Sequence, residues 1–298
     1  MGKKYKFGGV GLLVAIVIAA LVVYLRSHTV AVLQPAGQIG AQERQLIVFA
    51  VLLSVVVVVP TFVLTIFIAW KYREGNHRPK KYNPDWDHSR VFESVWWGIP
   101  ILIIGVLTVV VWHSSRTLDP YRSLASAKKP MTIQVVALDW KWLFIYPDQH
   151  VASVNQAQIP VGTPVDFQIT SDTVMNSFWV PQLGGQIYAM PGMITQLHLV
   201  ADKPGSYAGS SANISGSGFA GMTFQVRVGS SDDFDKWVNS AHQSMRPLDS
   251  SSYGQLAKPS KYAAVSYYSD VQNGLFENIA MKYMGMDMGH MSAMGAGR

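Results

Sequence analysis

Three long apolar stretches dominate the first 113 residues of the chain. They cover residues 8–25, 46–70 and 94–112, and the second and third carry no charge. About 20 helical residues cross the hydrocarbon core of a bilayer, so both of these stretches are long enough to span it. We therefore predict a transmembrane helical hairpin over residues 44–113.

The first apolar stretch follows Lys3, Lys4 and Lys6, which is the arrangement of a secretory signal or of a retained signal anchor. No small-x-small cleavage pattern stands out after it. Residues 1–28 are therefore predicted to be either a signal peptide or a signal anchor, and both alternatives stay open.

The pattern changes after residue 130 to short segments of β type, separated by turns rich in glycine and proline. Examples are residues 131–138, 164–170, 194–200 and 223–228. We predict an all-β sandwich or barrel over residues 120–230 and a helical extension over residues 231–285. Residues 286–298 are rich in Met and His and have little to bury, so we expect a disordered tail there.

The basic excess of the chain lies beside the apolar stretches. Residues 1–113 hold 11 Lys and Arg against 5 Asp and Glu, whereas the remaining residues are balanced. Six of these basic residues lie between the second and third stretches, and the positive-inside rule places that loop in the cytoplasm. The β domain is then exported, to the periplasm in a Gram-negative cell. This distribution argues against a nucleic-acid surface, which needs basic residues clustered on a folded domain.

Four ordered segments, residues 137–147, 170–178, 182–193 and 204–222, resemble the exported domain of subunit II of the heme–copper oxidases. The likeness covers about residues 44–285 and includes the aromatic segment that opens that domain. It implies a membrane-anchored chain in which two transmembrane helices precede a cupredoxin-like Greek-key barrel.

The chain departs from the copper-bearing members of that family at the ligands of the copper pair. Those members use two thiolates, two imidazoles, a thioether and a backbone carbonyl, and soft sulfur donors hold the metal. The corresponding positions here are Asn176, Ser211, Asn213, Ser215, Phe219 and Met222, and the chain has no cysteine. Only Met222 keeps a ligand type, so we predict a vestigial site that holds no metal.

The loss of these ligands makes the chain resemble subunit 2 of the ubiquinol oxidases, most of all those of the cytochrome bo type. The resemblance implies a non-copper subunit of a proton-pumping terminal oxidase in the bacterial inner membrane. Hemes and one copper are expected in subunit I, ubiquinol is the expected substrate, and subunits III and IV are expected partners. No cytochrome c is expected to dock. The alternative is a membrane-anchored periplasmic binding module or copper-handling protein, with the Met/His tail as a Cu(I) ligand.

Three further residues have two interpretations each. Glu93 directly precedes the third apolar stretch at its cytoplasmic end, where an acidic residue favours a helix N-terminus; the resemblance implies the entrance of a proton path. Trp140 and Trp142 match aromatic positions that serve electron transfer in copper-bearing relatives. Without copper that role has no donor, so we expect both to pack against subunit I.

Overall fold

The computed structural model describes residues 30–73, 88–124 and 128–283, with six isolated positions between 16 and 27. Most of the predicted signal segment, most of the basic loop and the Met/His tail lie outside these residues. The chain divides into two compact units: Gln45–Arg122 forms one, and Met1–Arg44 with Ser123–Arg298 forms the other.

The first unit contains most of α2 (Gln38–Lys71) and all of α3 (Arg90–Thr117), two helices long and apolar enough to cross a membrane. Nearly all of their large apolar side chains are exposed, which a water-soluble protein avoids. Hydroxyl groups within them are satisfied locally: Ser54 Oγ donates to the carbonyl of Ala50 and Thr61 Oγ1 to that of Val57. Such internal bonding is required where no water is present.

The second unit contains two main β-sheets. The strands are β1 (Met131–Leu138), β2 (Lys141–Tyr146), β3 (Val151–Val154), β4 (Gln156–Pro160), β5 (Pro164–Ser171), β6 (Asn176–Trp179), β7 (Gln186–Ala189), β8 (Thr195–Val200), β9 (Gly205–Ser211) and β10 (Thr223–Gly229). The order is β12-β3-β2-β1-β5-β8 in one sheet, where β12 is Ser266–Tyr268, and β4-β10-β9-β6-β7 in the other. The alternating burial of β10, with Phe224, Val226 and Val228 inward, is typical of sheets that pack face to face.

Aromatic rings fill the space between these sheets. Phe178 stacks on Phe224 at 5.0 Å between ring centroids, and Trp142 meets both rings edge-on at 5.4 and 5.6 Å. Aromatic pairs in such arrangements contribute about 0.5–1.5 kcal/mol beyond the area they bury. Gly209 leaves the space for Phe224, because a Cβ there would lie 2.2 Å from that ring.

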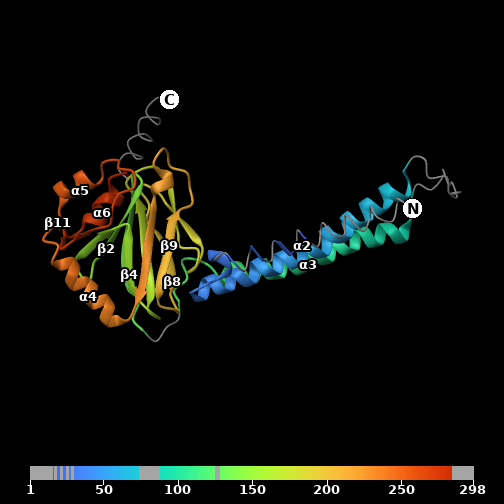
Figure 1. The fold of residues 1–298 in the computed structure, drawn as a ribbon, viewed down its shortest axis with the longest axis horizontal. Helices are drawn as coiled ribbons and strands as arrows, with labels where there is room; N and C mark the ends of the chain where they lie inside the picture. The colour runs from blue at the N-terminus through green and yellow to red at the C-terminus, as the bar shows by residue number, and fades with distance from the viewer. Residues whose placement is uncertain are drawn as a thin grey trace, which may run out of the picture. The chain divides into compact units, whose positions relative to one another are not determined.

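An extension after β10 packs on the β domain (Figure 1): Leu248, Tyr253 and Phe276 lie on the outer face of the first sheet, whereas its first helix adds Phe234 and Ala241 to the core between the sheets. It comprises α4 (Ser231–His242), β11 (Pro247–Leu248), α5 (Ser250–Leu256), β12 (Ser266–Tyr268), β13 (Asp270–Val271) and α6 (Leu275–Met281). Phe276 and Ile279 of α6 pack with Leu143 and Ile145 of β2 in a second apolar cluster. Since β2 is covered on both faces, all six of its residues are buried.

A strap before the membrane helices also packs on the β domain. It includes the short 3-10 helix η1 (Ala31–Leu33) and a bridge between Gly37 and Ala201. The Ala36 N–H donates to the carbonyl of Gln182 at 2.8 Å. Gly37 is required here, because a Cβ would lie 2.3 Å from the Val200 carbonyl oxygen.

Candidate functional site

The residues predicted at the vestigial copper site come together at one end of the β domain. Asn176 begins β6, Ser211 ends β9, and Met222 lies between the 3-10 helix η2 (Phe219–Gly221) and β10. All three are buried, with 0%, 4% and 1% of their surface exposed. The sheet pairing brings these segments together, since β9 is hydrogen-bonded to both β6 and β10.

A hydroxyl group stands at the centre of this site. Ser211 Oγ lies 3.2 Å from Asn176 Oδ1 and 3.1 Å from the carbonyl of Asn213, its two possible acceptors. It accepts hydrogen bonds from the backbone N–H groups of Ser177 at 3.3 Å and Asn213 at 3.4 Å. The amide of Asn176 in turn donates to the Val174 carbonyl at 2.9 Å. The buried polar groups therefore satisfy one another, as stability requires.

The other predicted positions lie along the same loop. Ser215 Oγ is 3.8 Å from Met222 Sδ, and Asn213 Nδ2 donates to the Met175 carbonyl at 3.0 Å. Phe219 is half-buried and supports the loop through its backbone, accepting from the Met222 N–H at 2.9 Å. We call residues 211–222 the copper-type loop.

The donor atoms of this site do not fit a copper pair. They are an amide oxygen, two neutral hydroxyl groups and one thioether, whereas the mixed-valence pair is held by soft thiolates. Within the part of the chain that the structure describes, no three His, Cys, Asp or Glu side chains cluster as metal ligands. Hydrogen bonds among these residues hold the loop, and the donor atoms include no thiolate for a copper pair.

The structure separates the two tryptophans that we expected at an interface. Trp142 has 0% of its surface exposed and lies within the aromatic core, so the prediction that it packs against another subunit is wrong. Its position on β2 points it inward, between the sheets. Trp140 is half-buried and covers the copper-type loop: its indole N–H donates to the Ser215 carbonyl at 3.2 Å. Its interface role stays a prediction.

Glu93 lies in the first turn of α3. Its Oε1 accepts a hydrogen bond from the backbone N–H of Ser89 at 3.1 Å. This contact satisfies one of the free N–H groups at a helix start. The predicted proton-path role is not tested by it.

An exposed apolar rim borders the site, and sequence analysis missed it. Val174, Met175 and Ile214 are 56%, 41% and 81% exposed. The bond from Asn213 Nδ2 to the Met175 carbonyl holds the two loops that carry them together. The presence of apolar residues within polar turn segments of the sequence could have predicted this rim. Adjoining exposed apolar side chains are typical of protein-interaction surfaces.

Two family models match the chain. The model described as cytochrome c oxidase subunit II, periplasmic domain, matches residues 149–228, and the model described as COX aromatic rich motif matches residues 242–287. The matched periplasmic domain confirms the predicted cupredoxin-like fold. With the two apolar helices, it makes the chain a membrane-anchored subunit.

Relatives of known type resemble nearly the whole chain. Cytochrome bo(3) ubiquinol oxidase subunit 2 of Pseudomonas putida is 51% identical over 89% of this chain and 84% of its own length. The protein of the same name from Pseudomonas aeruginosa is 50% identical over 84% of this chain and 75% of its own length. Ubiquinol oxidase subunit 2 of Acetobacter aceti is 48% identical over 85% and 82%. These relatives support the oxidase subunit over the anchored binding module, and the chain therefore belongs to the ubiquinol oxidase subunit 2 family, within subunit II of the heme–copper oxidases.

Proposed function

We propose that this chain is the non-copper subunit II of a proton-pumping ubiquinol oxidase. The observation that carries the proposal is the copper-type loop, where Ser211 and Asn176 form a neutral hydrogen-bond network in place of metal ligands. Electrons cannot be relayed through such a network, so they must enter the complex elsewhere. Ubiquinol dissolves in the bilayer and delivers electrons there without the exported domain.

In this proposal the redox centres of the complex lie in another subunit. Hemes and one copper lie in subunit I, which reduces oxygen to water, and subunits III and IV complete the complex in the bacterial inner membrane. In this proposal residues 44–113 anchor the chain, residues 120–230 form the periplasmic domain and residues 231–285 its extension. The exposed apolar faces of α2 and α3 are available to lipid and to subunit I.

Gentle detergent purification tests this function. We expect the chain to co-isolate with a larger heme protein, and the complex to oxidise ubiquinol but not reduced cytochrome c. A heme-free monomer as the only native form would contradict the proposal. So would near-infrared absorption from a mixed-valence copper pair in the purified chain.

We also propose that Glu93 lies at the entrance of a proton path into subunit I. Glu93→Gln separates this role from the helix contact, since glutamine still accepts a hydrogen bond from the Ser89 N–H but cannot ionise. We expect Glu93→Gln and Glu93→Ala to lower quinol oxidation by a similar factor, measured in proteoliposomes with proton uptake. If Glu93→Gln keeps the activity and Glu93→Ala loses it, Glu93 serves only to stabilise the start of α3.

A further inference from the structure

The extension after β10 is tied to the segment that carries Asn176. Asp172 lies directly after β5, four residues before Asn176, and only 2% of its side chain is exposed. Three donors reach its carboxylate: Tyr253 Oη at 2.7 Å, Lys282 Nζ at 2.7 Å and Tyr283 Oη at 2.8 Å. All three come from the extension.

The three donors keep the protons that these hydrogen bonds require. The hydrogen bond to Asp172 raises the pKa of Lys282, so the ammonium persists. Burial raises the pKa of Tyr253 and of Tyr283, so both hydroxyls remain donors. A buried carboxylate without such partners is strongly unfavourable, because it has lost its water.

The extension also reaches the copper-type loop. The buried Lys141 donates to the Lys258 carbonyl at 2.7 Å and to Ser260 Oγ, which ties down the turn after α5. Two residues further on, the ring of Tyr262 lies against Gly221, where an added Cβ would come within 2.7 Å of it. The extension therefore contacts both loops whose residues replace the copper ligands.

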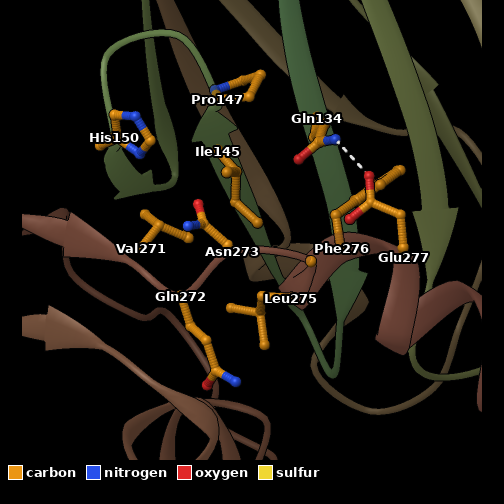
Figure 2. A pocket seen from close by; sticks show the side chains of 11 residues that line it. Gln134, Ile145, Pro147, His150, Val271, Gln272, Asn273, Leu275, Phe276 and Glu277 are labelled. Atoms are coloured by element: carbon orange, nitrogen blue, oxygen red, sulfur yellow. Dashed lines mark hydrogen bonds between the residues drawn. The ribbon is translucent and has the colours of Figure 1, made fainter.

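A small pocket lies where the extension meets the first sheet. It has a volume of about 120 Å³ and lies between α6 and β1–β2, and Gln134 Nε2 donates to Glu277 Oε1 at 3.1 Å on its border (Figure 2). This hydrogen bond is a further polar contact between the extension and β1.

We infer that the extension adds a second cross-link between the two loops of the vestigial site, beside the direct hydrogen bonds of Ser211 to Asn176 and of Asn213 to Met175. In a copper-bearing relative the metal would join these loops; here Asp172 anchors one loop to the extension, and the ring of Tyr262 lies beside Gly221 of the other. Tyr253, Lys282 and Tyr283 are positioning residues: they act through the loops, which present the apolar rim of Val174, Met175 and Ile214. The consequence for the rim rests on the proposed function.

Hydrogen exchange of the purified complex tests the cross-link without an activity assay. The triple variant Tyr253→Phe, Lys282→Met, Tyr283→Phe removes the three donors to the Asp172 carboxylate described above. We expect exchange of peptides covering residues 172–177 and 211–222 to rise on the order of tenfold or more, while β1 and β2 stay protected. Adding Asp172→Asn removes the stranded charge but does not restore the cross-link, so most of the rise should remain; full reversal would overturn the inference.

Met245→Ala is the matched control, since Met245 is an exposed residue of the same extension; it should leave both loops unchanged. If β1 and β2 lose protection in the triple variant, Lys282→Met alone is measured and must give a smaller rise at the same loops. Unchanged exchange at both loops, or a rise at residues 172–177 alone, would overturn the inference. A complex that fails to oxidise ubiquinol but shows the expected exchange would overturn the proposed function only.

Discussion

At the scale of single residues, the vestigial site is a network of hydrogen-bonded polar groups around the buried Ser211. Ser211 has the four-residue spacing to Ser215 that cysteines have in copper-bearing relatives, yet its neutral hydroxyl works as a hub for backbone and amide groups. Such a hub is costly to remove, since Asn176 and Ser177 are buried and their polar groups would lose a partner.

Ser211→Ala should therefore destabilise the β domain by about 1–3 kcal/mol, the cost of leaving buried polar groups unsatisfied. The measurement is the free energy of unfolding of the full chain in detergent, followed by tryptophan fluorescence. Ser217→Ala is the control, because Ser217 is an exposed residue of the same loop. Equal stability of the two variants would show that the hub is not needed.

At the scale of elements, short polar contacts hold the small helices of the extension. Asp249 caps α5: its carboxylate accepts from the backbone N–H groups of Ser251 and Ser252 and from the Ser252 hydroxyl. Hydrogen bonds from the Ser252 backbone and side chain hold the pKa of Asp249 below its usual 3.8. A helix of seven residues depends on such a cap and on tertiary packing, since it is too short to be stable alone.

The depressed pKa of Asp249 predicts how stability depends on pH. The folded state binds the proton less tightly than the unfolded state, so the stabilisation is present above about pH 4 and is lost as pH falls through the folded pKa. We expect Asp249→Asn to lower the thermal unfolding midpoint slightly at pH 7, with the gap closing in acid. Asp235→Asn, on the exposed face of α4, serves as the control. A gap that persists unchanged in acid would contradict this prediction.

At the scale of the whole molecule, the apolar rim is the exported feature best suited to hold a partner. Ile214 is 81% exposed at the tip of the copper-type loop, beside Met175. A side chain of that size stays exposed to water at a cost unless a partner covers it. The rim is also the feature that the extension positions through Asp172.

If subunit I docks on the apolar rim, Ile214→Asp should weaken the association with the heme-bearing subunit by about tenfold or more, because docking would then bury a charge. The measurement is the ratio of heme to this chain after affinity purification. Met245→Asp is the matched control, since Met245 is 87% exposed on the extension. An unchanged heme ratio in Ile214→Asp would show that the rim is not the docking surface.

The sequence by itself determined the elements whose signals are local. The uncharged stretches predict α2 and α3 because length and apolarity suffice for a membrane helix. Residues 131–138 form β1 as predicted. The residue types at Asn176, Ser211 and Ser215 predict a vestigial site, since neutral oxygen donors do not hold a copper pair; the structure brings the three residues to one end of the β domain.

Only the tertiary structure decided which side chains are buried and which elements contact one another. The two tryptophans Trp140 and Trp142 look alike in sequence, but the left-handed backbone at Trp140 (φ 63°) turns one ring over the loop while β2 carries the other into the core. The partners of Asp172 lie 81 to 111 residues away along the chain. Hydrogen bonds over such separations follow from packing of whole elements, and no local pattern of residues reveals them.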